Sequence, residues 1–333
     1  MSTSSETVTV LDPAQFGKLR LKSHDSLSTI DDLIKSHASE SEDFPLVAAP
    51  VSGVIDFEEH SARDIDRYVD AAAQCLLSKG LPPADPARDE APIAGLLCQS
   101  GLDMVITLLG LIRLGYGALL LSTRLAAPAY ARLMSMTNCS ILISTPTFGP
   151  TIDDIEQERP LQRLSLLQRD DYIGVKPAPF RRQYDAAKEN KKIAVIIHSS
   201  GSTGFPKPIY LRHAQCLSTF TQNFGLREFL VSPLFHSQGF YELFRTIYSK
   251  KCIYLCNYAI PHTRQSLAAQ LEYLKPELFA CVPYILKLLC ETDEGIEQLA
   301  KTRLVVYAGS GCPDDIGDLL VKRDVNLVQN YGT

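Results

Sequence analysis

Several features that mark whole classes of protein are missing from this 333-residue sequence. It contains no run of the roughly 18 apolar residues that a membrane-spanning helix requires, so we expect no membrane partner. Its first ten residues, MSTSSETVTV, lack the basic-then-apolar order of a secretory signal, which favours a cytoplasmic protein. Its net charge of -5 supplies no basic field, which argues against nucleic acid as a partner.

Clustered cysteines are missing as well. The nine cysteines are irregularly spaced and never form a Cys-x-x-Cys pair, which argues against a disulfide framework and against a zinc cluster. We therefore expect them to be small core residues and predict no metal ligand in this chain. The sequence also has no internal repeat of fixed period.

The pattern that is present predicts the fold class. Apolar runs of strand length alternate with amphipathic helical stretches, which is typical of parallel βα units. We therefore predict an α/β fold with two βα lobes, each a mostly parallel sheet flanked by helices. The expected strands are 92–98, 118–121 and 139–144 in the first lobe, and 193–198, 208–212, 228–232, 252–255, 278–282 and 304–309 in the second.

We expect the chain to divide into four parts. Residues 1–25 form an N-terminal extension, 26–144 the first lobe, 145–192 an irregular crossing and 193–333 the second lobe. The crossing is inferred from five prolines that interrupt a charged, weakly periodic stretch.

One short segment, HSSGSTGFPK at 198–207, stands out for its small hydrogen-bond donors and its single cation. Glycines permit tight turns whose backbone N–H groups bind anions, and the hydroxyl groups and Lys207 add donors and charge. Such a loop suits a polyphosphate, although composition alone leaves a flexible Ser/Gly hairpin loop equally open. It is not a Walker A loop, because Gly204 is followed by Phe205 and Lys207 by Pro208.

This loop resembles the phosphate-binding signature of the adenylate-forming superfamily, which includes acyl-CoA synthetases, luciferases and peptide-synthetase adenylation domains. Four more segments resemble the superfamily's motifs in the same order: LGYGALLLS (114–122), PLFHSQG (233–239), YAGSGCP (307–313) and NYGT (330–333). The chain looks most similar to fungal peptide-synthetase-like enzymes of secondary metabolism that adenylate a carboxylic acid. Those enzymes often pass the acid to a phosphopantetheine carrier and then to a reductase or thioesterase domain.

The resemblance implies ATP-dependent conversion of a small-molecule carboxylic acid into an acyl-adenylate, and it implies roles for particular residues. The ATP phosphates would be held by Ser199, Ser200, Gly201, Ser202, Thr203, Gly204 and Lys207. The adenine side would be formed by Gly309, Ser310, Gly311, Asn330 and Tyr331, and the acid side by His236 and Gly239. For the two glycines flanking Ser310 the alternative is a plain turn, and for Tyr331 a core aromatic.

His236 bears on the choice of acid. Amino-acid-activating relatives carry an aspartate at the matching position to pair with the substrate's ammonium group, and here an imidazole replaces it. An imidazole has no reason to attract an ammonium group, so the resemblance implies an aryl, α-keto or aliphatic acid rather than an α-amino acid. The alternative is a capping or core histidine at the start of a helix near residue 237.

Later landmarks of the superfamily do not occur in these 333 residues. NYGT matches only the start of a Tyr-Gly-x-Thr-Glu motif, so we expect the magnesium ligand beyond residue 333. The ribose-binding aspartate, the C-terminal barrel and the lid with its lysine are also absent. We therefore expect the first two lobes of an adenylation domain, without a complete catalytic set and inactive alone. The alternative is a non-catalytic nucleotide- or acid-binding fragment or remnant.

Overall fold

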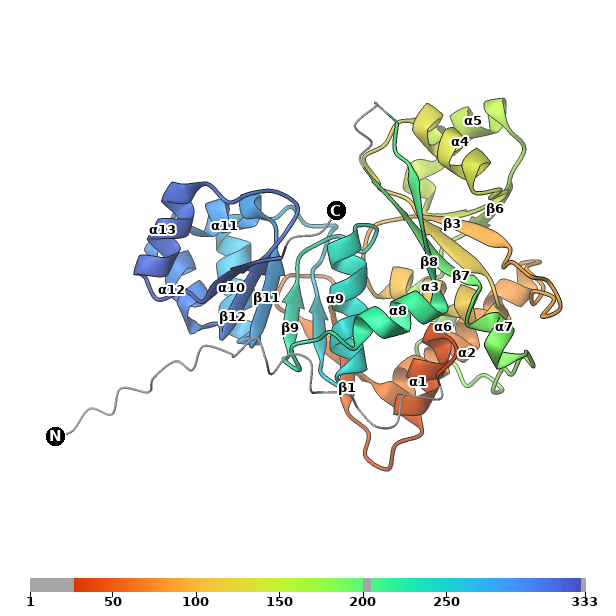
Figure 1. Ribbon diagram of the computed structural model, residues 1–333, viewed down its shortest axis with the longest axis horizontal. Helices are drawn as coiled ribbons and strands as arrows, with labels where there is room; N and C mark the ends of the chain where they lie inside the picture. Colours follow the sequence, from red (N-terminus) through yellow and green to blue (C-terminus); the bar gives the residue numbers. More distant parts are fainter. Residues whose placement is uncertain (1–26, 200–204, 331–333) are drawn as a thin grey trace.

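The computed structural model describes residues 27–199 and 205–330, which fold into two β-sheets with helices packed on them (Figure 1). The expected contacts of Ser200, Gly201, Ser202, Thr203, Gly204 and Tyr331, and the expected N-terminal extension, lie outside these described residues. The α/β fold with two mostly parallel sheets is confirmed.

The first sheet has six strands in the order β6-β5-β3-β4-β7-β8. The strands are β3 (Ile93–Leu97), β4 (Gly117–Leu120), β5 (Ile141–Ser144), β6 (Gln162–Ser165), β7 (Ile193–His198) and β8 (Pro208–Arg212). All neighbouring pairs are parallel except β7 and β8, which form an antiparallel pair at the edge. Every residue of β3 is buried, as its uninterrupted apolar sequence predicts for a central strand.

Helices cover both faces of this sheet. On one face lie α2 (Ala62–Ser78) and α3 (Leu102–Leu114), and α3 ends at Gly115, whose φ of 89° gives it a left-handed cap. The two helices approach closely because Gly110 has no side chain: a Cβ there would lie 2.8 Å from the Cβ of Ala72. On the other face α4 (Ala127–Met136) and α5 (Gly149–Glu158) cover a smaller apolar cluster.

The second sheet has seven strands in the order β13-β12-β11-β9-β10-β1-β2. The strands are β1 (Pro45–Pro50), β2 (Phe57–Ser61), β9 (Glu228–Leu230), β10 (Ile253–Leu255), β11 (Leu278–Cys281), β12 (Leu304–Tyr307) and β13 (Leu327–Gln329). Only β2 runs antiparallel to its neighbour.

The helices of the second sheet also form two layers. One face packs against α10 (Arg264–Leu274), α11 (Pro283–Leu289), α12 (Asp293–Lys301) and α13 (Asp314–Lys322). The other contributes to the largest apolar core, together with α1 (Ile30–Ala38), α8 (His213–Phe220) and α9 (Ser237–Tyr248). That core contains residues of both sheets, among them Leu96 and Leu230, so one continuous apolar interior joins them.

The sheets do not divide the chain at the expected boundaries. β1 and β2, within the expected first lobe, belong to the second sheet, and β7 and β8, within the expected second lobe, belong to the first. The expected crossing 145–192 contains α5 and β6, which add another βα unit to the first sheet. It also contains three short helices, η2 (Pro146–Phe148), α6 (Arg169–Tyr172) and α7 (Ala186–Glu189).

A buried ion cluster joins the helices of the first lobe. The side chain of Arg113 on α3 is fully buried, and its guanidinium lies 2.7 Å from Asp31 on α1. It also lies 2.5 Å from Asp66 and 2.7 Å from Asp70, both on α2. Three carboxylates therefore share one cation that no water reaches, and the arrangement fixes the three helices relative to one another.

None of the helices in the described part of the chain is both long and apolar enough to cross a bilayer.

Candidate active site at the carboxyl ends of the strands

The described residues predicted for the site lie where parallel strands end. Ser199 follows β7, His236 lies six residues after β9, Gly309 lies two residues after β12, and Asn330 follows β13 directly. In open α/β sheets ligands bind at this edge, because loops and helix N-termini converge there. The backbone N–H of Leu234, after β9, donates to the hydroxyl oxygen of Ser100, after β3, at 2.9 Å, so the edges of both sheets meet here.

The phosphate-loop candidate is closed at its base by a hydrogen bond. The backbone N–H of Ser199 donates to the carbonyl oxygen of Lys207 at 3.0 Å, which continues the antiparallel pairing of β7 and β8. Lys207 is solvent-exposed, so its ammonium group is available to an anion in solution. Next to it, the guanidinium of Arg132 lies 5.0 Å from the ring centre of the exposed Phe205.

His198, which the sequence places only as a strand residue, anchors a neighbouring loop. Its Nε2 accepts a hydrogen bond from the backbone N–H of Ser122 at 3.1 Å, so Nδ1 carries the proton of the neutral ring. The buried Tyr130 donates to the carbonyl oxygen of Ser122 at 2.7 Å and holds the same loop from the other side. Desolvation lowers the pKa of His198, which keeps the acceptor nitrogen unprotonated.

His236 directly precedes α9, yet its side chain makes no capping hydrogen bond. The ring lies against Phe235, with 4.7 Å between the ring centres. Desolvation, His198 and the cation of Arg124 all lower the pKa of His236, and no carboxylate of the described residues contributes to this shift. The imidazole is therefore neutral near pH 7 and stands beside a positive charge.

Gly239 has a packing role at the same turn. A Cβ at this position would lie 2.1 Å from the carbonyl oxygen of Pro233, so only glycine lets the first turn of α9 approach that backbone. A contact between Gly239 and substrate stays a prediction.

The adenine-side residues surround an open surface. Gly309 has a φ of 96°, which favours glycine, and nothing lies within 4 Å of where a Cβ of Gly311 would be. The backbone N–H of Asn330 donates to the carbonyl oxygen of Tyr307 at 2.8 Å, which places Asn330 beside this loop. Ser310 is exposed as well, so the described part of this loop leaves an open surface, and its contact with adenine stays a prediction.

Two groups that the sequence analysis missed also belong to the site. Arg124, in the loop after β4, acts on His236 and on His262, and it lowers the pKa of both. Tyr258, after β10, donates from its hydroxyl to the carbonyl oxygen of Val231 at 2.5 Å and supports the turn after β9. Neither residue lies in a segment with a motif of its own, and only tertiary structure brings them to the site.

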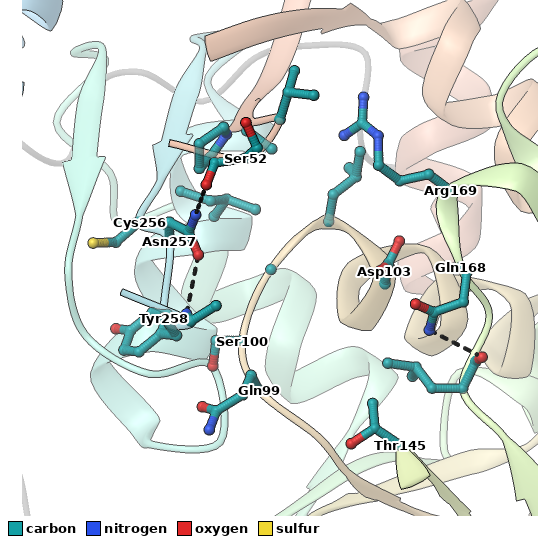
Figure 2. A pocket seen from close by; sticks show the side chains of 18 residues that line it. Ser52, Gln99, Ser100, Asp103, Thr145, Gln168, Arg169, Cys256, Asn257 and Tyr258 are labelled. Atoms are coloured by element: carbon teal, nitrogen blue, oxygen red, sulfur yellow. Dashed lines mark hydrogen bonds between the residues drawn. The ribbon is translucent and has the colours of Figure 1, made fainter. Parts of the chain in front are cut away.

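A cavity of about 330 Å³ lies between the two sheets and is shown in Figure 2. It is lined by the turn after β1 and the loops after β3, β5, β6 and β10, and the site residues predicted within the described part of the chain do not line it. Two of its polar side chains are engaged with protein: Asn257 donates to the carbonyl oxygen of Gly53 at 2.9 Å, and Asp103 accepts from Tyr172 at 2.5 Å. Burial raises the pKa of Asp103, against the effects of Tyr172 and Arg169.

Within the described residues, no cluster of three or more His, Cys, Asp or Glu side chains is arranged to hold a metal ion. The expected magnesium ligand beyond residue 333 therefore stays a prediction.

Comparison with known proteins identifies the family of the chain. A sequence profile for the family described as AMP-binding enzyme matches residues 36–333. A carboxylic acid reductase from Neurospora crassa is 26% identical over 257 residues, which cover 71% of this chain and 24% of the relative. The non-canonical non-ribosomal peptide synthetase ascB from Acremonium egyptiacum is 27% identical over 292 residues, which cover 79% of this chain and 26% of the relative. The chain thus spans about a quarter of the length of these relatives.

Solved structures match the fold. The N-terminal domain of FACL13 from Mycobacterium tuberculosis has a TM-score of 0.74 at 17% identity, covering 92% of this chain and 76% of that one. The N-terminal subdomain of NpsA from Klebsiella oxytoca, in complex with 3-hydroxybenzoyl-AMSN, has a TM-score of 0.72 at 16% identity, covering 92% and 73%.

Proposed function

Since this chain belongs to the family of AMP-binding enzymes, we propose that it supplies the ATP- and acid-binding part of an enzyme that adenylates a carboxylic acid. A carboxylate oxygen of the acid attacks the α-phosphorus of ATP, and the bond between that phosphorus and the β-phosphate bridging oxygen breaks. The products are an acyl-adenylate and pyrophosphate. Two anions must meet in this reaction, so the protein's main tasks are positioning and charge stabilisation.

The residues have separate roles in this proposal. The loop between Ser199 and Lys207 holds the β- and γ-phosphates, while Gly309, Ser310, Gly311, Asn330 and Tyr331 form the adenine side. His236, at the start of α9, faces the acid. Magnesium would neutralise part of the phosphate charge.

The electrostatic surroundings of His236 carry the choice of acid. Among the residues that the structure describes, the charged and titratable groups acting on this imidazole are Arg124 and a second histidine, His198, and no carboxylate. An α-ammonium group placed here would face Arg124 without a counter-ion, and repulsion between like charges disfavours that position. We therefore propose an aryl, α-keto or aliphatic acid as substrate, rather than an α-amino acid.

The full catalytic set is wider than these 333 residues. By resemblance, the magnesium-binding glutamate, the ribose-binding aspartate and the lid lysine lie in segments that follow the NYGT motif. We propose that the chain alone binds nucleotide and acyl-adenylate but turns over slowly, and that carrier and reductase or thioesterase domains act on the product. The setting that we propose is cytoplasmic secondary metabolism.

A panel of acids tests the proposal. The chain, joined to the C-terminal segment of a homologue, is assayed for acid-dependent exchange of pyrophosphate into ATP. Exchange should appear with benzoic, α-keto or aliphatic acids and stay at background with α-amino acids. Exchange with an amino acid as the best substrate would contradict the assignment of His236, and no exchange with any acid would contradict adenylation.

A further inference from the structure

A glutamine in the substrate-side motif links two parts of the candidate site. Gln238 is the second residue of α9, two residues after His236, and its side-chain amide is bonded at both ends. Its Oε1 accepts from the hydroxyl of Ser232 at 2.8 Å, and its Nε2 donates to the carbonyl oxygen of Cys281 at 3.2 Å. The amide therefore connects the end of β9 and the start of α9 to the end of β11.

The same carbonyl also holds the adenine-side loop. The backbone N–H of Ala308 donates to the carbonyl oxygen of Cys281 at 3.2 Å. Ala308 lies between the end of β12 and Gly309, whose positive φ turns the chain away from the sheet. One oxygen with two lone pairs thus accepts from the acid-side helix and from the adenine-side loop.

From this geometry we infer that Gln238 is a positioning residue, which holds the acid-side start of α9 in fixed relation to the loop at Gly309. The inference rests on the proposed function, because its effect on ligands requires that acid and adenosine bind on these two sides. An acyl-adenylate spans both sides, so its affinity depends on their relative position. AMP or the free acid alone contacts one side and depends on it much less.

Only a side chain with a donor and an acceptor makes both bonds. Ser232 is 3% exposed and Cys281 is fully buried, so water does not replace a lost partner at either end. In Gln238→Glu the shape is kept, but an ionised carboxylate places an oxygen against the carbonyl of Cys281. When that carboxyl takes up a proton, it donates to the carbonyl and restores the bond.

The test uses the 333-residue chain and two readouts. The first is amide hydrogen exchange without ligand, in which Gln238→Glu at pH 8 should speed exchange in peptides covering residues 307–310 and leave the core strand β3 unchanged. The second is calorimetric titration with a non-hydrolysable acyl-sulfamoyl adenosine and with AMP. The variant should lose about tenfold in affinity for the acyl analogue, because one hydrogen bond to a buried partner contributes about that much. Its loss of affinity for AMP should be much smaller.

Acidification supplies the readout that a purely structural defect would not give. Lowering the pH from 8 to about 4.5, close to the usual glutamate pKa of about 4.3, should restore part of the analogue affinity of Gln238→Glu relative to the wild type, whereas Gln238→Leu should stay weak at both values. Gln265→Glu, at an exposed glutamine of α10, carries the same charge change and should match the wild type throughout.

The positioning role would be overturned if amide hydrogen exchange at 307–310 stayed unchanged in Gln238→Glu and in Gln238→Leu. Equal losses of affinity for AMP and for the acyl analogue would overturn it as well. Failure of the wild-type chain to bind the acyl analogue would instead contradict the proposed function, and the exchange measurement would still decide the role of Gln238.

Discussion

Ser100 and Leu234 join the two sheets beside the candidate site. The backbone N–H of Leu234, in the turn after β9, donates to the hydroxyl oxygen of Ser100 at 2.9 Å, and Ser100 lies in the loop between β3 and α3. Both residues are buried, so the bond is shielded from water and fixes the substrate-side turn against the first sheet. The site is thus assembled from loops of both sheets.

Removing the charge of Lys207 should weaken ATP binding far more than acid binding. A charge-assisted contact to phosphate contributes about 1.5–3 kcal/mol, so the affinity of Lys207→Ala for a non-hydrolysable ATP analogue should fall roughly tenfold or more. Isothermal titration calorimetry on the chain measures this directly. Lys287→Ala, at an exposed lysine of α11, is the matched control. Equal affinities of the two variants for the ATP analogue would show that Lys207 does not contact the phosphates.

Replacing His236 by aspartate should change which ligands are tolerated. The new carboxylate offers a partner to an ammonium group, so the affinity for an aminoacyl-sulfamoyl adenosine should rise relative to that for the acyl analogue, by roughly tenfold. Arg124→Gln should shift the same ratio in the same direction, because it removes the cation next to His236. A ratio that stays constant in both variants would show that the substrate's α-position lies elsewhere.

A buried pair of glutamates should make stability depend on pH. Thr246 donates to Glu228 at 2.5 Å, and Arg245 pairs with Glu242 at 2.8 Å. Burial first, and then the neighbouring Glu242, raise the pKa of Glu228 well above its usual range, against the effects of Thr246 and Arg245. A raised folded-state pKa gives stability that is complete below the unfolded-state value and is lost as the pH rises toward the folded-state value.

The variant Glu228→Gln removes this titration while keeping the acceptor for Thr246. Its melting temperature relative to the wild type should therefore increase between pH 5 and pH 8, as measured by differential scanning calorimetry. A difference that is constant over this range would mean that Glu228 ionises in the folded protein much as it does in the unfolded one.

Truncating Arg113 should be strongly destabilising. Arg113→Met leaves three aspartates of α1 and α2 without their shared cation, and breaking a buried charge pair costs about 3–5 kcal/mol. The pKa of Asp31 is lowered in the folded state despite burial, through Arg113 and then Lys35, so the stabilisation is lost as the pH falls. Urea unfolding should show that Arg113→Met lowers the free energy of unfolding most near pH 7 and less near pH 4.

Arg67 provides the control for that comparison. It lies on α2 and pairs at the surface with Asp64, with 43% of its side chain exposed, so Arg67→Met should cost less than about 1 kcal/mol. Equal losses at the two arginines would contradict the account of the buried cluster.

The central strands could be predicted from the sequence because each carries its own signal. β3, β4 and β7 are apolar throughout their middle and are followed by turns or helices. A short, uninterrupted apolar run of this kind is typical of a strand that is buried on both faces of a parallel sheet. Edge strands lack this signal. β6 reads Gln-Arg-Leu-Ser with mostly exposed residues, and β13 has only three residues, so neither differs locally from a loop.

Sheet membership could not be predicted, because it depends on partners far along the chain. The register of Val47 opposite Ile253 places β1 in the second sheet, and nothing near Val47 in the sequence encodes that pairing. The same holds for the site. The motifs predicted a site at particular strand ends, but the bonds of Ser100 and Tyr258 and the electrostatic effect of Arg124 on His236 are recognisable only from the tertiary structure.

The most direct test of the central claim is calorimetric titration of the 333-residue chain with a benzoyl-sulfamoyl adenosine and with the corresponding phenylalanyl analogue. Saturable binding of the benzoyl analogue is expected, together with much weaker binding of the phenylalanyl analogue, whose ammonium group would face Arg124. Binding of neither analogue, or tighter binding of the phenylalanyl analogue, would contradict the claim that this site adenylates a non-amino carboxylic acid.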